Sequence, residues 1–243
     1  MIYRLVACFL LPALLSILVA GLVQAESSQG ALTGGITLTY EEQEAGVEAY
    51  PVRILVVPEY LRMDDGHDDD DFMLFDRDSR TIFSINHEDR GILVIEQSAP
   101  GGGRATLPDL NLGIEKAEDK NIPLIAGKRP EIYRFTADGD VCLEAVVAPG
   151  LLQPAVQALG EYGRLLAERQ RATLDSTPVE FRTPCYLSRY VYAPDRPLEK
   201  GLPIQEWDNS GYRRTLTDFR DYVQIDPKLF ELPSAYNRNT LGR

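Results

Sequence analysis

Residues 72–95 decide the fold, and they read FMLFDRDSRTIFSINHEDRGILVI. This stretch holds three short runs rich in β-branched and aromatic residues, at Phe72–Phe75, Thr81–Ile85 and Ile92–Ile95, which is the composition of β-strands. Polar connections such as Asp76–Ser79 separate the runs. Short strands with such tight links predict an antiparallel meander of hairpins.

Similar strand-like runs flank this stretch on both sides. They are Ile36–Tyr40, Val52–Val57, Ile132–Phe135, Leu187–Tyr192, Ile204–Trp207 and Tyr222–Ile225. The run Phe72–Phe75 is apolar at every position, whereas a strand with one face in water alternates between apolar and polar residues. We therefore expect the sheet to be covered on both faces or to line an apolar cavity.

One amphipathic helix is predicted from Leu151 to about Thr173. Its apolar and small residues recur at helical spacing and form one stripe: Leu152, Val156, Leu159, Gly163 and Leu166. Charged and amide side chains fall on another stripe. The sequence thus predicts an α+β fold, mostly β, in which one long amphipathic helix packs on an antiparallel sheet.

The N-terminus carries the pattern of an export signal. Arg4 precedes an apolar run, Leu5–Val23, and Ala25 completes a small-residue cleavage site. The pattern predicts a signal peptide of residues 1–25, cleaved before Glu26, and a periplasmic or secreted protein. Because about 20 apolar residues span a bilayer, an uncleaved membrane anchor is the alternative. After cleavage, no stable membrane span is expected.

The net negative charge of the chain argues against some classes of binding partner. The 243 residues include 37 acidic and 25 basic side chains, a net charge of −12. Phosphates would be repelled, so the sequence predicts no nucleic-acid partner. Beyond the signal peptide we expect a flexible segment at 26–35, a single β-rich domain at 36–236 and a disordered tail at 237–243.

Only two cysteines follow the signal peptide, Cys142 and Cys185. An even number of cysteines in an oxidising compartment predicts one disulfide. Two free thiols or a pair of metal ligands are the alternatives.

Searching for catalytic motifs gives a negative result. The sequence contains no GxSxG, HExxH, P-loop or GxGxxG pattern, so we predict neither a catalytic residue nor a cofactor. A hydrolase with an unrecognised pair of carboxylates stays open, because an acidic chain offers many such pairs.

The most unusual local feature is Asp64–Asp71, which holds six aspartates and one histidine in eight residues. Carboxylate oxygens are ligands for Ca²⁺, and Asp64, Asp68 and Asp70 are the candidates for a weak site. The spacing does not match an EF-hand loop. We nevertheless predict no metal and interpret the segment as a solvated hairpin tip whose charges oppose aggregation, with the Ca²⁺ site as the alternative.

Four segments carry a family resemblance: YLRMD at Tyr60–Asp64, the hairpin Leu74–Ile85, GLPI at Gly201–Ile204 and FELPSAY at Phe230–Tyr236. In this order they resemble segments of lipoprotein-carrier-like (LolA/LolB-type) periplasmic domains, over about residues 36–236. Ala235 departs from that family, which usually has glycine there.

The resemblance implies an unclosed antiparallel β-barrel, a half-barrel covered by helix, with an apolar concavity for acyl chains. It therefore suggests an exported, non-catalytic binding or carrier domain for a lipid or lipidated molecule. The alternative is an envelope accessory protein that acts through protein–protein contacts without a small ligand.

Overall fold

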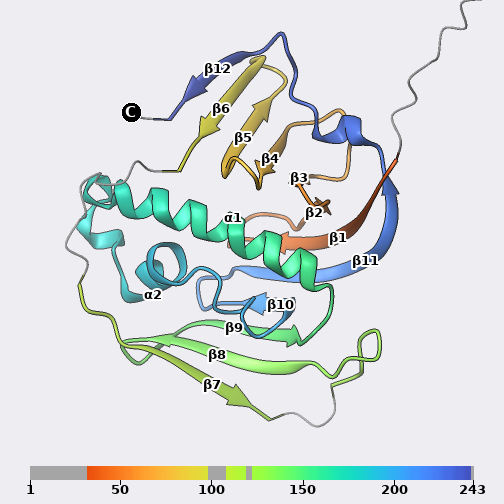
Figure 1. The fold of residues 1–243 in the computed structure, drawn as a ribbon. Helices are drawn as coiled ribbons and strands as arrows, with labels where there is room; N and C mark the ends of the chain where they lie inside the picture. Colours follow the sequence, from red (N-terminus) through yellow and green to blue (C-terminus); the bar gives the residue numbers. More distant parts are fainter. Residues whose placement is uncertain (1–31, 98–107, 119–121, 242–243) are drawn as a thin grey trace, which may run out of the picture.

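The computed structural model describes residues 32–97, 108–118 and 122–241, which build one twelve-stranded sheet (Figure 1). The strands are β1 (Thr33–Gln43), β2 (Tyr50–Val56), β3 (Tyr60–Asp64), β4 (Phe72–Asp76), β5 (Thr81–Asn86), β6 (Gly91–Ile95), β7 (Leu112–Ala117), β8 (Glu131–Ala137), β9 (Asp140–Ala148), β10 (Leu202–Trp207), β11 (Arg213–Ile225) and β12 (Asn237–Thr240). The predicted signal peptide, with its cleavage site at Ala25 and Glu26, lies outside the described residues.

The sheet consists of two meanders that meet in its middle. Its order is β12-β6-β5-β4-β3-β2-β1-β11-β10-β9-β8-β7, so β11 brings the C-terminal half back to pair with β1. All neighbouring strands are antiparallel except β12, which runs parallel to β6. The edge strands β7 and β12 do not pair with each other. The prediction of a mostly β fold with an unclosed antiparallel sheet is therefore confirmed.

The hairpins β4–β5 and β5–β6 share one turn design. Each has a four-residue loop that ends in an arginine with positive φ, 51° at Arg80 and 49° at Arg90. The side chains of Asp76 and Asn86 accept hydrogen bonds from the backbone N–H three residues later, at 2.9 Å and 2.6 Å. Such turns fix the register between strands, which is why residues 72–95 predict this part of the sheet well.

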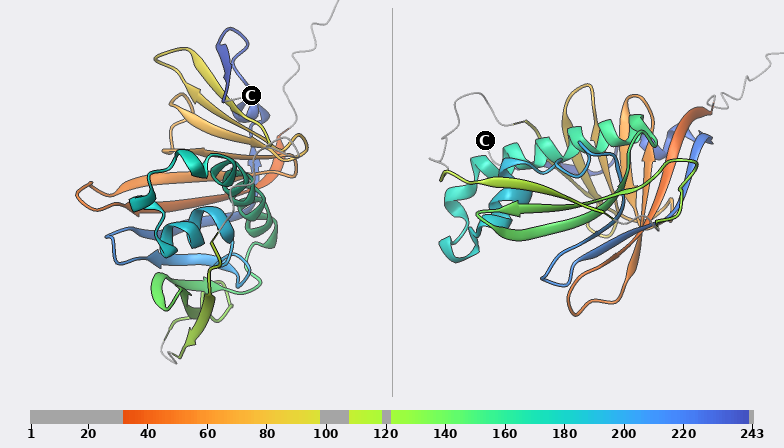
Figure 2. Two further views of the ribbon diagram at one scale, coloured as in Figure 1. Left: turned by 90° about the vertical axis from the view of Figure 1, so that its left-hand side faces the viewer. Right: turned by 90° about the horizontal axis from the view of Figure 1, so that it is seen from below.

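The two faces of this hairpin region pack against different covers. One face joins α1 (Gln153–Ala172) through residues such as Leu61, Phe75 and Ile82. The opposite face, with Phe72 and Leu74, packs beneath the 3₁₀ turn η4 (Pro227–Phe230) and the residues after it. Of the two expected alternatives, cover on both faces or an apolar cavity, this region of the sheet shows the first. Figure 2 shows α1 lying along one face of the curved sheet.

The expectation of a single helix is wrong, because the described residues contain two α-helices. They are α1 and the short α2 (Pro184–Leu187). Short 3₁₀ turns, η1 (Leu174–Ser176) and η2 (Val179–Phe181), connect them. None of the described helices combines the length and hydropathy of a membrane span.

The strand predicted at Leu187–Tyr192 is also wrong. It forms the end of α2 and a π-helical turn, η3 (Ser188–Tyr192). Thr183 caps α2 by accepting a hydrogen bond from the Tyr186 N–H at 3.2 Å, and Pro184 occupies the first turn. Leu187 and Val191 are four residues apart and both buried, which is a helical spacing. Tertiary packing here outweighs the strand propensity of Tyr and Val.

Both ends of the domain extend further than predicted. Thr33–Gly35, expected in the flexible segment 26–35, belong to β1. Asn237–Thr240, expected in the disordered tail 237–243, form β12. This strand is exposed and polar, and backbone hydrogen bonds to the edge of β6 hold it, including Leu241 N–H to Val94 C=O at 2.9 Å. Backbone pairing of this kind leaves no hydrophobic signal in the sequence.

Candidate functional site

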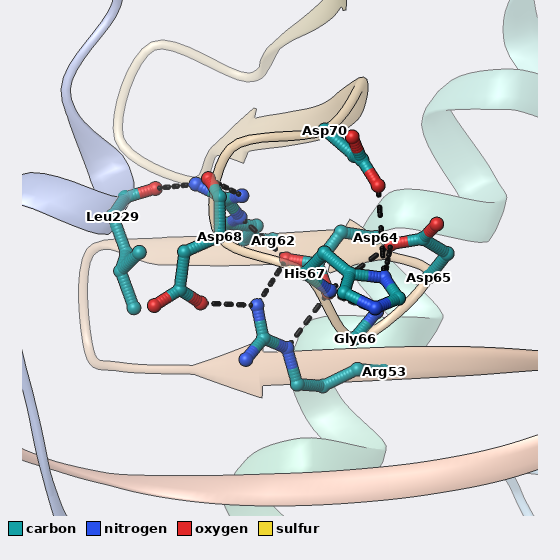
Figure 3. Close-up of polar contacts among 9 residues, drawn as sticks. All are labelled: Arg53, Arg62, Asp64, Asp65, Gly66, His67, Asp68, Asp70 and Leu229. Carbon is teal, nitrogen blue, oxygen red and sulfur yellow. Dashed lines mark hydrogen bonds and ion pairs between the residues drawn. The ribbon is translucent and has the colours of Figure 1, made fainter.

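The acidic turn between β3 and β4 differs from the predicted Ca²⁺ site (Figure 3). Arg53 lies 2.7 Å from a carboxylate oxygen of Asp64 and 2.7 Å from one of Asp68. Arg62 approaches the other oxygen of Asp64, again at 2.7 Å. Two of the three expected ligands are thus paired with guanidinium groups, which repel a cation. This arrangement gives no support to the alternative of a Ca²⁺ site at Asp64, Asp68 and Asp70.

A different trio gathers at the tip of the same turn. Ligand atoms of Asp65, His67 and Asp70 lie within 4.8 Å of one another, and all three residues are exposed. Asp65 accepts hydrogen bonds from His67, and the bond from the His67 backbone N–H is the main cause of the lowered pKa of Asp65. The turn is therefore solvent-exposed and held by its own hydrogen bonds, and these contacts are no evidence for a bound metal.

Arg62 gives the YLRMD segment a structural role. Its side chain is buried and its guanidinium carbon lies 3.9 Å from the centre of the Phe72 ring. It donates hydrogen bonds to the backbone carbonyls of Leu229, at 2.7 Å, and Asp68, at 3.0 Å. The guanidinium thereby joins β3 to η4, so the YLRMD segment anchors the C-terminal cover.

A cavity of about 340 Å³ lies between the sheet, α1 and the segment that contains η3. This volume falls in the range of small-ligand pockets, roughly 300–1000 Å³. Much of its wall is apolar and comes from several elements: Met63, Phe135, Leu143, Leu159, Leu166 and Leu198. Gly163 and Leu166 belong to the predicted helix stripe, so part of that stripe faces the cavity, and Leu166 also packs against the core. Burial raises the pKa of the lining residue Tyr162 to about 12.

A charged cluster forms part of the same wall. Arg214 Nε lies 3.0 Å from a carboxylate oxygen of Glu42, and its Nη1 lies 3.7 Å from one of Glu206. The guanidinium stacks 3.9 Å above the Tyr40 ring. Burial raises the pKa of Glu206, and Arg214 opposes that rise. One largely buried guanidinium therefore faces two carboxylates, Glu42 and Glu206.

Arg189, from η3, completes the polar part of the wall. It forms an ion pair with Asp208 and stacks on two aromatic rings, 5.4 Å from the centre of Tyr190 and 5.0 Å from that of Tyr212. Its charge is therefore compensated within the protein.

The predicted disulfide is confirmed. Cys142 of β9 and Cys185 of α2 are bonded across a sequence separation of 43 residues. Cys142 and the residues from Ser188 to Tyr190 line the cavity. The disulfide therefore fixes the helical segment that closes one side of the cavity.

Sequence reasoning missed the charged residues of the cavity: Glu42, Arg189, Arg196, Glu206 and Arg214. Single charged residues in polar surroundings resemble solvent-exposed positions in a sequence. A weak signal exists in β10, where Glu206 lies two positions after the apolar Ile204 in a segment that is otherwise largely apolar.

Comparison with known proteins defines no family. No family model and no curated protein matches the chain. An uncharacterized conserved protein from Thermus thermophilus is similar at TM-score 0.44 and 9% identity, over 86% of this chain and 92% of that one. PNGF-II is similar at TM-score 0.40 and 9% identity in one crystal form, and 0.41 and 8% in another, over 86% of this chain but only 31% and 32% of PNGF-II. At such low TM-scores these likenesses assign no function.

Proposed function

We propose that this chain is an exported, non-catalytic binding or carrier domain for a lipid or lipidated molecule. The observation that carries the proposal is the largely apolar cavity between α1 and the sheet. An unclosed sheet with a helix on one face is also what the resemblance to LolA/LolB-type carriers implies.

Burial of an acyl chain supplies the favourable free energy that this proposal requires. Each methylene moved from water into an apolar site gains about 0.8 kcal/mol. An acyl chain that buries about ten methylenes therefore gains roughly 8 kcal/mol, before the entropic costs of binding are subtracted. The lining residues Phe135, Leu143 and Leu159 offer the surface for this contact, and the proposal requires no catalytic group.

We place this activity in the periplasm or outside the cell. The support is the disulfide between Cys142 and Cys185, since disulfides persist in oxidising compartments. The export pattern in residues 1–25 agrees with this location.

Filling the cavity is expected to block binding. Gly163 lies on α1 at the cavity, and a Cβ added there meets only Pro194, at the ordinary contact distance of 3.8 Å. A phenylalanine at this position projects its ring into the space that an acyl chain would occupy. We expect Gly163→Phe to weaken binding of 1-decanol, measured by isothermal titration calorimetry, by at least about tenfold.

The matched control is Gly163→Ala. It adds one methyl group that fits, and it raises the stability of the helix by roughly 1 kcal/mol. This variant should bind 1-decanol about as well as the unmodified protein. Equal affinities of the phenylalanine and alanine variants would show that decanol does not occupy this cavity.

A second candidate function is that of an envelope accessory protein, and one observation favours it. The 3₁₀ turn η2 exposes two large apolar side chains, Val179 at 78% and Phe181 at 62%. Exposed apolar residues that lie close together are typical of protein–protein contacts. This candidate predicts that Phe181→Ser abolishes capture of a protein partner and leaves decanol binding unchanged.

A further inference from the structure

Arg196 is a buried cation in the wall of the cavity. The residue is 6% exposed, and its guanidinium carbon lies 5.3 Å from the centre of the Phe135 ring. Nη1 donates to the Thr136 carbonyl at 3.1 Å and to the Ser188 hydroxyl at 3.3 Å, while Nη2 donates to the Gly113 carbonyl. Every one of these acceptors is uncharged.

The positive charge of Arg196 therefore has no direct counter-ion in the part of the chain that the structure describes. No carboxylate there forms an ion pair with it, and Glu199 acts on it only at longer range. Burial lowers the pKa of Arg196. Buried charges are normally paired, because an unpaired one loses its hydration without compensation.

The other two arginines of the cavity are already neutralised. Arg189 pairs with Asp208, and Arg214 pairs with Glu42. Arg214 also faces Glu206 at 3.7 Å, and burial raises the pKa of Glu206, which favours the uncharged form of this second acid. Of the three arginines that line the cavity, Arg196 is therefore the one whose charge a ligand could neutralise. The apolar wall lies in the same cavity. One uncompensated cation beside an apolar wall suits a molecule with an anionic end and an alkyl chain.

We propose that the cavity takes a single-chain acyl anion whose oxyanion head group pairs with Arg196. This inference rests on the proposed function and adds the charge of the ligand to it. A guanidinium group recognises carboxylate and phosphate oxygens through parallel hydrogen bonds. A volume of about 340 Å³ is at the low end of ligand pockets, which suits one chain. Because the net charge of the chain is −12, the protein as a whole does not attract anions. Recognition of an anionic head group would therefore depend on Arg196.

The test compares three probes with the same alkyl chain by isothermal titration calorimetry: decanoate, decyl phosphate and neutral 1-decanol. In the unmodified protein we expect the better anion to bind at least about tenfold more tightly than 1-decanol. The tighter of the two anions identifies the head group as carboxylate or phosphate. If both anions bind no more tightly than 1-decanol, the inference is overturned while the proposed function stands. If none of the three binds, both fail.

A set of variants assigns the preference to Arg196. Arg196→Met should reduce the ratio of anion to alcohol affinity to about one. Arg196→Lys keeps the charge and should retain a preference for the anion, so it covers the case in which the methionine variant does not fold. Arg134→Met is the matched control, because it removes a half-exposed arginine of β8 that pairs with Glu144 and does not line the cavity. A preference that survives in Arg196→Met, or is lost equally in Arg134→Met, would overturn the assignment.

Discussion

Replacing Asp64 with alanine should lower the free energy of unfolding by about 3–5 kcal/mol. The Asp64 side chain is 0% exposed and lies between the guanidinium groups of Arg53 and Arg62. It also accepts a hydrogen bond from the Gly66 N–H at 3.0 Å. Without the carboxylate, the buried Arg62 keeps its charge but loses its counter-ion, and this loss dominates the effect.

Chemical denaturation in urea measures this change, and the acidic turn itself provides the control. Asp65 is the next residue, is exposed, and accepts hydrogen bonds from His67 of the same turn. Asp65→Ala should therefore alter the unfolding free energy by less than about 0.5 kcal/mol. Similar small losses for both variants would contradict the buried ion pair described above.

Removing the disulfide is expected to have the second largest effect on stability. The double variant Cys142→Ser, Cys185→Ser frees a loop whose ends are 43 residues apart, and we expect a loss of about 2–4 kcal/mol in urea denaturation. Dithiothreitol should reproduce that loss in the unmodified protein.

The same reductant should leave the double variant unchanged, which separates the disulfide from other effects of reduction. Since Cys142 and the turn after Cys185 border the cavity, the variant should also bind 1-decanol more weakly. Equal stability of variant and unmodified protein would mean that the bond does not constrain the fold.

The sequence predicts the parts of the fold that depend on local signals. Residues 72–95 carry both strand composition and turn residues, so the hairpins follow directly. The spacing from Leu152 to Leu166 predicts the apolar face of α1. The pairing of Cys142 with Cys185 follows from their being the only two cysteines after the predicted signal peptide.

The errors occur where distant contacts decide the structure. Leu187–Tyr192 has strand composition, but the packing of Leu187 and Val191 makes it helical. In the sequence, Asp64 and Asp68 are candidate metal ligands, but in the structure both pair with Arg53 from another strand. The strand β12 depends mainly on backbone pairing with β6, which leaves no pattern in the sequence.

The cavity could not be predicted for a similar reason. Its charged residues are far apart in the chain, from Glu42 on β1 to Arg214 on β11, and each is an ordinary charged residue in its local sequence. Only the antiparallel return of β11 onto β1 brings these two together. The structure is needed to show that the hydrogen-bond acceptors of Arg196, on Gly113, Thr136 and Ser188, are all uncharged.

The central claim is that the cavity holds an acyl chain, and native mass spectrometry tests it most directly. The full chain is expressed in a bacterial host, purified from the periplasm, sprayed under native conditions and then extracted with organic solvent. We predict a heterogeneous mass adduct that is recovered in the organic phase as lipid. A clean mass of the protein alone, unchanged after incubation with decanoate, phospholipid and an acylated peptide, would contradict the claim.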